Sequence, residues 1–358
     1  MKGAARGAAS ATRRIGADGR ERAFFGGCSY LGLAHEARVL DAARDAAERF
    51  GVGAGAARGT TGTCVLHEAL EAELAAFAGA EDAALFSDAA LADLAVGLAF
   101  VREGERVVCD LDAHPCVTDA VRAGGGRVVH GDDDALAAAR AEGCAFAFTD
   151  GTFPSAARTA PIDALVAAGF ERIAIDDAHG FGLLGARGAG AAEALDLTGD
   201  RDLLVVALSK CLGAAGGAVL GSRRTVDAVR ATSAFACTTA PPPPIVAAAL
   251  AALRIARDDD ARRARALSNA RALHALVDAI DPAPTRRAVL FPVRALALDS
   301  VAATTALHAH LVDAGIDAPL IRYPGGPAGD HLRFAITSEH TDADLGRLEE
   351  ALRTAPVA

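Results

Sequence analysis

Short apolar runs alternate with amphipathic segments over the first two thirds of the chain. The apolar runs predict strands at 83–86, 106–108, 127–129, 145–148, 173–175, 203–208 and 218–220. The segments between them place apolar residues at helical spacing and predict helices at 37–50, 67–78, 89–101, 115–123 and 161–168. Wholly apolar strands that alternate with helices are typical of a mostly parallel sheet covered by helices on both faces. The sequence therefore predicts an α/β fold in which ligands bind beyond the carboxyl ends of the strands.

The pattern changes after the four prolines at 241–244. An apolar helix is predicted at 245–256, a charged helix at 258–278, strands at 289–297 and 331–336, and a closing helix at 342–353. This part predicts a smaller C-terminal α/β domain. We therefore expect an N-terminal arm (1–35), a large ligand-binding domain (36–245) and a small domain (246–358).

Composition narrows the class of protein. The 358-residue chain is 52% hydrophobic and has a net charge of −10, which argues against a nucleic-acid surface. The most apolar run is too short to cross a bilayer, so no membrane association is expected. Seven cysteines without a CxxC pair favour reduced thiols in the cytoplasm, and neither a disulfide framework nor a metal site is predicted.

Lys210 is one of only two lysines in this arginine-rich chain, and it directly follows an apolar strand. A partly buried lysine can lose its proton and form a Schiff base with a carbonyl compound, whereas arginine stays protonated. We therefore interpret Lys210 as a nucleophilic amine. The alternative is a surface lysine whose stem packs on apolar neighbours.

A second strand ends in Asp176, followed by Asp177 and His179. A carboxylate at a strand end stays ionised best beside a cation, and a protonated pyridine nitrogen would be such a partner. Together with Lys210 this suggests pyridoxal phosphate, which acts as an electron sink only while its ring nitrogen is protonated. Taken alone, the acidic pair could also belong to a metal or salt-bridge cluster.

Two further residues are candidates on weaker grounds. His114 follows a predicted strand and could lie flat against an aromatic ring, although a loop histidine is often simply solvated. Arg333 lies on a predicted strand, where an inward guanidinium needs an anion. A substrate carboxylate and a structural ion pair both satisfy that requirement.

Several motifs occur together in one order and spacing. They are SYLGL (29–33), the glycine-rich loop 53–62, HEALEAELAAF (67–77), the D-x-x-H segment 111–114, DDAHGFGLLG (176–185), SKCLGAAGG (209–217), TTAPPP (238–243) and LRFAITSEHTDADLGRL (332–348). This set, over roughly residues 28–350, resembles the α-oxoamine synthases, a family of fold-type-I pyridoxal phosphate enzymes. Within that family the 8-amino-7-oxononanoate synthases are the most similar.

The resemblance implies a reaction and a set of roles. The family condenses an amino acid with an acyl thioester, held on CoA or on a carrier protein, and releases CO2 and the thiol to give an α-amino ketone. The cofactor contacts implied by the resemblance are Lys210 in Schiff-base linkage, Asp176 at the ring nitrogen, His179 at the phenolic oxygen, His114 stacked on the ring, Ser87, Asp88 and Ala89 at the phosphate, and Thr238 at the phosphate of the partner subunit. Arg333, Arg322 and Ser29 are the implied substrate-binding residues, and a homodimer with its active site at the subunit interface is the implied working unit.

The chain departs from the family pattern near the expected cofactor. Ala207 replaces a common threonine, Pro154 lies within a segment that usually carries a serine, and Asp88 lies where a Ser-Gly turn usually binds the phosphate. A carboxylate at Asp88 is expected to cap the following helix and to repel a phosphate. An aminotransferase and a non-catalytic partner subunit are therefore the alternatives to the acyltransferase.

Overall fold

The computed structural model describes residues 7–282, 288–323 and 326–355, which form two compact units. Unit 1 combines 1–35, 154–158 and 260–358, and unit 2 combines 36–153 and 159–259. The predicted division into functional parts at 35/36 and 245/246 stays a prediction.

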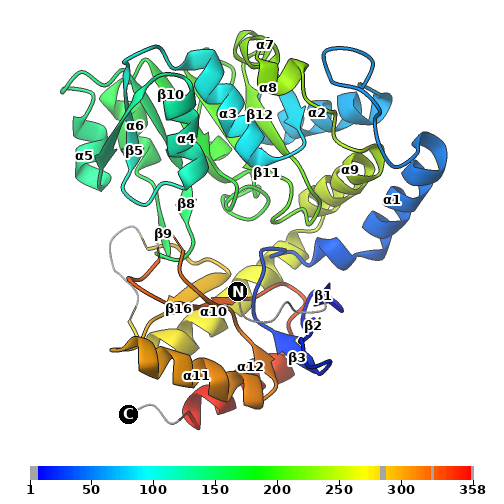
Figure 1. Cartoon of the computed structure of the whole chain (residues 1–358), viewed down its shortest axis with the longest axis vertical. Coiled ribbons are helices and arrows are strands. Elements are labelled where there is room, and N and C mark those ends of the chain that lie inside the picture. The colour runs from blue at the N-terminus through cyan, green and yellow to red at the C-terminus, as the bar shows by residue number, and fades with distance from the viewer. Residues whose placement is uncertain (1–6, 283–287, 324–325, 356–358) are drawn as a thin grey trace. The chain divides into compact units, whose positions relative to one another are not determined.

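Unit 2 is built on a seven-stranded sheet (Figure 1). In spatial order its strands are β4 (Asp82–Phe86), β12 (Gly217–Gly221), β11 (Asp202–Ala207), β10 (Arg172–Asp176), β7 (Phe146–Asp150), β5 (Arg106–Asp110) and β6 (Arg127–Gly131). The strands β11, β10, β7, β5 and β6 run parallel, and β12 is antiparallel to both of its neighbours. The predicted α/β class with a mostly parallel sheet is therefore confirmed.

Helices surround the sheet, and they are α1 (Ala37–Phe50), α2 (Val65–Ala78), α3 (Ala89–Phe100), α4 (Pro115–Ala123), α5 (Asp133–Ala138), α6 (Ile162–Ala168), α7 (Arg223–Arg230), α8 (Ser233–Ala236) and α9 (Pro243–Asp258), with a 3-10 turn at Gly190–Ala194. Of these helices, α2, α3, α4, α5 and α7 pack on the strands of the sheet, whereas α1 packs on α9 and α9 on α2. Alternate residues of the strands form one core with α3, α4, α7 and α8, and α2 packs on β4 and β12. Because the side chains of a strand alternate between faces, Asp150 and Asp176 share the face that carries Phe148 and Ala174, which belong to this core.

The described residues of unit 1 form two small sheets and three helices. One sheet has the order β1 (Gly7–Ala8), β2 (Arg13–Ile15), β3 (Glu21–Phe24) and β14 (Ile316–Asp317), and the other has β13 (Val293–Leu296), β16 (His331–Ala335) and β15 (Leu320–Ile321). The helices are α10 (Asp260–Asp278), α11 (Val301–Asp313) and α12 (Asp342–Arg353), preceded by a 3-10 turn at Leu33–His35. The strands β8 (Thr152–Phe153) and β9 (Arg158–Thr159) form a separate two-stranded ribbon.

One expectation for unit 1 was wrong in detail, and one helix was missed. The strand predicted at 289–297 is limited to Val293–Leu296, and α11 had no counterpart in the prediction. The sequence of α11 is rich in Thr and His, yet Leu307 and Leu311 bury its inner face in the core of unit 1. Among the described residues, no helix is both long and apolar enough to cross a membrane.

Candidate active site

The carboxyl ends of neighbouring strands gather acidic side chains in unit 2. Asp176 is the last residue of β10 and is in register with Asp150, the last residue of β7. Lys210 follows the end of β11, the other neighbour of β10, and is half-buried. The chain thus concentrates titratable groups at the edge where open α/β sheets bind ligands.

Asp176 is almost completely buried, with 4% of its surface exposed. Its Oδ1 accepts the backbone N–H of Ala178 at 2.9 Å, and its Oδ2 lies 3.9 Å from the Sγ of Cys116. Burial raises the pKa of the Asp176 carboxyl, while the positive charge of Lys210 acts most strongly against that rise. One backbone donor and one weak thiol donor leave this carboxylate poorly satisfied, so a cationic ligand atom would stabilise it.

Asp177 has a structural role. Its carboxylate accepts the backbone N–H groups of Ala191 at 2.7 Å and Gly180 at 3.2 Å, and burial raises its pKa to about 7. At Gly190, with φ +63°, a Cβ would collide with the Asp177 carboxylate, so only glycine fits. Asp177 therefore fixes the loop that presents half-buried His179, whose carbonyl oxygen lies 3.9 Å from the Sγ of Cys211.

His114 is held at the N-terminus of α4. Its backbone N–H donates to Oδ2 of Asp150 at 2.8 Å, and its Nδ1 lies 2.6 Å from the Sγ of Cys116. Burial lowers the pKa of the imidazole. The ring is therefore neutral at neutral pH and suited to stacking on an aromatic ligand.

The N-terminus of α3 carries Ser87, Asp88 and Ala89, of which Ser87 and Asp88 are exposed. The predicted cap is confirmed, because the Asp88 side chain accepts the backbone N–H of Ala90 at 2.8 Å. A Cβ on Gly217 would collide with the backbone of Ala89, so β12 approaches this turn closely. Pyridoxal phosphate therefore fits the strand ends through its ring, while Asp88 places a negative charge where its phosphate is expected.

Thr238 lies just beyond α8 and is half-buried. Its hydroxyl donates to the carbonyl oxygen of Ala234 at 2.7 Å, which leaves the oxygen lone pairs available to a donor.

The predicted substrate residues lie in unit 1. Arg333, on β16, is half-buried, and its Nη1 and Nη2 both lie 3.8 Å from the Sγ of Cys28. Burial acts to lower the pKa of Arg333, but the electrostatic influence of Tyr30 and Cys28 outweighs it and raises the pKa. No carboxylate among the described residues forms an ion pair with Arg333, so the guanidinium is suited to an external anion.

Arg322 and Ser29 are less constrained. The Nε of Arg322 donates to Asp330 at 3.1 Å, and 72% of the Arg322 side chain is exposed. Ser29 accepts a long hydrogen bond of 3.4 Å from the backbone N–H of Ala34.

Sequence reasoning missed two buried carboxylates beside Asp176. One is Asp150, which lies two residues beyond the end of the strand predicted at 145–148. The other is Asp93, the only charged residue of α3 and 0% exposed. A single aspartate in an otherwise apolar helix was the available signal.

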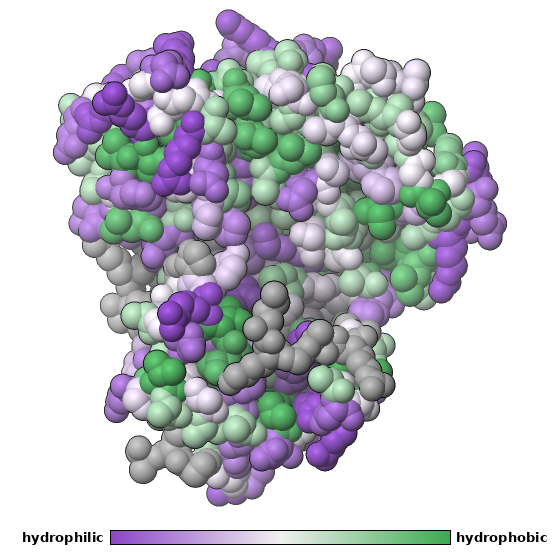
Figure 2. All heavy atoms as spheres, in the orientation of Figure 1, coloured by the Kyte–Doolittle hydropathy of each residue, from purple (hydrophilic) through white to green (hydrophobic). Residues whose placement is uncertain are grey.

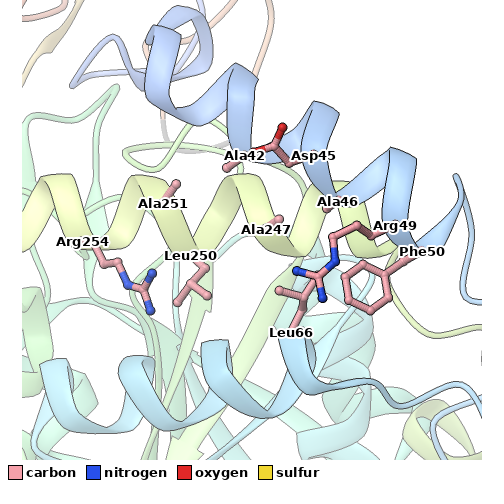
Figure 3. Close-up of a pocket in the computed structure, with 10 residues that line it drawn as sticks. All are labelled: Ala42, Asp45, Ala46, Arg49, Phe50, Leu66, Ala247, Leu250, Ala251 and Arg254. Carbon is pink, nitrogen blue, oxygen red and sulfur yellow. The ribbon is translucent and has the colours of Figure 1, made fainter.

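Unit 2 also contains a cavity of about 210 Å3 between α1, α2 and α9, shown in Figure 3. Phe50, Leu66 and Leu250 line it together with Arg49 and Arg254. None of its lining residues is a predicted site residue, so this cavity is distinct from the strand-end site.

Comparison with known proteins agrees with the strand-end site. Residues 25–352 match the family of class I and II aminotransferases. Curated relatives include the 8-amino-7-oxononanoate synthases of Halorhodospira halophila, 39% identical over 95% of this chain and 87% of the relative, and of Hahella chejuensis, 35% identical over 95% and 88%. The chain therefore belongs to the aminotransferase class I and II family of fold-type-I enzymes.

Solved structures give the same fold. The structure of SPT with the PLP internal aldimine is 28% identical, has a TM-score of 0.89 and covers 99% of this chain and 94% of its own. The 8-amino-7-oxononanoate synthase of Francisella tularensis, 23% identical with a TM-score of 0.79 over 92% and 96% of the two chains, supports the fold alone. The resemblance to α-oxoamine synthases, with 8-amino-7-oxononanoate synthases among the similar relatives, is confirmed.

Proposed function

We propose that this protein catalyses the decarboxylating condensation of an amino acid with an acyl thioester. The names of its relatives, the 8-amino-7-oxononanoate synthases, support this proposal. The observation that carries the proposal is the buried, poorly satisfied carboxylate of Asp176 on a strand adjacent to the one that leads to Lys210. This pair suits pyridoxal phosphate, because one group stabilises a ring cation and the other supplies an amine.

Bound pyridoxal phosphate would supply an electron sink for the charge that develops at Cα of the amino acid. Asp176 would hold the proton on the ring nitrogen, and neutral His114 would stack on the ring face. His179 would donate to the phenolic oxygen, while Ser87 and Ala89 would contribute to the phosphate end. Lys210 would supply the amine that holds the aldehyde and would move the proton at Cα of the amino acid as a general base.

The substrates are anionic, which suits the arginines of unit 1. Arg333 binds the α-carboxylate of the amino acid in a bidentate manner, since its guanidinium has a thiol rather than a carboxylate beside it. Arg322 pairs with a carboxylate on the acyl chain by exchanging its exposed bond to Asp330, and Ser29 contributes a hydroxyl.

We also propose a cytoplasmic homodimer in which Thr238 reaches the phosphate of the partner subunit. None of the seven cysteines, all of them described by the structure, forms a disulfide bond, in keeping with a reducing compartment. Val52 and Val65 are 84% and 64% exposed, and Figure 2 shows apolar residues on the surface over α1 and α9. A partner subunit would cover such side chains.

Release of free thiol from a panel of acyl-CoAs, including pimeloyl-CoA, tests the reaction with single amino acids and added pyridoxal phosphate. We expect release that depends on one amino acid and falls at least about 10³-fold in Lys210→Ala. Lys210→Arg is the matched control, since it keeps the charge but cannot act as a nucleophile or base. Turnover by either variant at the wild-type rate would refute the proposal.

Mixing two inactive variants tests the homodimer. If Thr238 serves the partner's site, Lys210→Ala and Thr238→Val subunits complement each other, because one site of each mixed dimer has both residues. Random exchange would restore about a quarter of wild-type activity. No recovery in dimers shown to have exchanged would mean that Thr238 acts within its own subunit.

A non-catalytic partner subunit is the second candidate, favoured by the carboxylate of Asp88 at the phosphate end. Absorbance titration with pyridoxal phosphate separates the two. No binding at high cofactor concentration would favour the second candidate, and conversion of the bound cofactor to its amine form by an amino acid would instead favour an aminotransferase.

A further inference from the structure

Asp93 is a buried carboxyl group to which the proposed function gives no role. It lies on α3 within the sequence AALADLAVGLAF and is 0% exposed. Neither Oδ1 nor Oδ2 has a hydrogen-bond partner among the described residues. An ionised carboxylate without donors is very costly in such surroundings, so Asp93 has to be neutral.

The surroundings of Asp93 strengthen that conclusion. One carboxylate oxygen of Asp93, one of Asp176 and the Sγ of Cys116 all lie within 4.8 Å of one another. Burial raises the pKa of Asp93 well above its usual range, and the negative charges of Asp176 and Asp150 raise it further, whereas Cys116 and Lys210 only partly oppose this. These groups come from β10, β7, α4 and the segment after β11. Two carboxyl groups this close cannot both be ionised, and the pair titrates as a unit.

The proton of the Cys116 thiol decides which donors are left for Asp176. The thiol of Cys116 keeps its proton, because burial raises its pKa. That proton can point to only one of the three acceptors around it. Nδ1 of His114 lies 2.6 Å from Sγ and Oδ2 of Asp176 lies 3.9 Å from it, while a carboxylate oxygen of Asp93 is within 4.8 Å, so the thiol is assigned to His114. Nδ1 of His114 also receives the backbone N–H of Cys116 at 3.3 Å, which identifies it as the acceptor of the neutral ring.

Asp176 therefore keeps one backbone donor, from Ala178, and a distant thiol. We propose that Asp93 is a positioning residue that holds the single proton of the Asp93–Asp176 pair, so that Asp176 alone carries the negative charge offered to the ring nitrogen of the cofactor. This inference rests on the proposed function for the identity of that ring, but the location of the proton is a property of the chain itself.

The arrangement makes the charge of the site depend on pH. When Asp93 finally loses its proton, the pair carries two negative charges in a buried place. Asparagine at position 93 would supply a side chain of the same shape that is neutral at every pH. Leucine would also be neutral, but without a polar group.

The test compares wild type, Asp93→Asn and Asp93→Leu as full-length proteins. Infrared spectra without added cofactor, on protein labelled with 13C-aspartate, report protonated aspartic acids directly. At neutral pH we expect a carboxylic-acid band in wild type that is missing from Asp93→Asn. No such band in the wild-type minus Asp93→Asn difference would refute the proposal, whether or not the protein turns over a thioester.

Pyridoxal phosphate binding as a function of pH provides the second measurement. We expect Asp93→Asn to match the wild-type affinity at low pH and to keep it at high pH, where wild type weakens about tenfold or more. Asp93→Leu, which is also neutral at every pH, should lose the same pH dependence. Identical pH profiles for wild type and Asp93→Asn would overturn the role, even if Asp93→Leu fails to fold. A lack of thiol release in all three proteins would instead count against the proposed function alone.

Discussion

Two aspartates five residues apart, the N-cap residue of α3 and a residue within that helix, have opposite environments. Asp88 is exposed, caps the helix and accepts a backbone N–H at 2.8 Å, whereas Asp93 is fully buried and has no hydrogen-bond partner among the described residues. Water and the N-terminus of the helix stabilise a negative charge on Asp88. Asp93 is neutral because neither water nor a hydrogen-bond donor of the described residues stabilises a charge on it. The same side chain therefore acts as an anion at one end of the proposed cofactor site and as an acid at the other.

The largest effect on activity is expected from a substitution of Asp176, the carboxylate beside Asp93. If Asp93 is neutral, Asp176 is the anion that holds the ring proton, and Asp176→Asn removes it. We expect thiol release to fall on the order of 10³-fold, with the protein still folded because the amide is nearly isosteric. Steady-state kinetics, with circular dichroism as the folding control, measure this, and an active Asp176→Asn would mean that the charge lies elsewhere.

Asp177 is an intermediate case, since it is buried but has two backbone donors. Its carboxyl has a pKa of about 7 in the folded protein against 3.8 in its usual state. Between these two pH values the folded chain therefore binds one more proton than the unfolded chain. The contribution of Asp177 to the free energy of unfolding is consequently largest below pH 4 and falls as pH rises toward 7. At about 1.4 kcal/mol per pH unit, the loss is roughly 4 kcal/mol.

Denaturant unfolding at a series of pH values checks this slope. Asp177→Asn should flatten the dependence of unfolding free energy on pH, because an amide does not titrate in this range. It should also lower stability at acid pH, because the amide oxygen can accept one backbone N–H while the NH2 group faces the other donor. An unchanged slope in the variant would assign the titration to another carboxyl group.

Removal of the exposed carboxylate of Asp88 is expected to strengthen cofactor binding. Asp88→Ser keeps an N-cap but removes the negative charge, so pyridoxal phosphate should bind about tenfold more tightly. Asp88→Ala is the matched control, because it removes the same charge and costs about 1 kcal/mol of stability through the lost cap. Fluorescence titration measures both, and weaker binding in Asp88→Ser would show that the carboxylate helps to hold the cofactor.

The smallest effect on stability is expected for Arg322. Its ion pair with Asp330 is exposed, so Arg322→Ala should change the free energy of unfolding by less than about 0.5 kcal/mol. If Arg322 binds the acyl chain, KM for an ω-carboxylated acyl-CoA should rise at least about tenfold, with no change for an unsubstituted acyl-CoA. Equal changes for both donors would remove the assignment.

The sequence predicted the residues that follow apolar strands. Lys210 and Asp176 are visible because polar side chains interrupt wholly apolar runs, and neighbouring parallel strands end at one edge. Asp150 was missed because its strand is longer than its apolar part. Asp93 was missed because an isolated aspartate in a helix usually faces water. Its burial depends on the close packing of α3 on α4, where a Cβ on Gly97 would collide with Ala120, and such a tertiary contact has no local signature.

The composition of unit 1 has a consequence for synthesis on the ribosome. One of its sheets pairs β3 with β14, so Ala23 lies beside Ile316, and all of its α-helices follow Asp259 in the chain. The first strands to leave the ribosome must therefore wait for almost the last ones, whereas unit 2 can complete its sheet once β12 has emerged to pair with β4. Such long-range pairing is slow and leaves strand edges open in the nascent chain. Unit 1, which carries Arg333, is consequently the part whose maturation should depend most on chaperones.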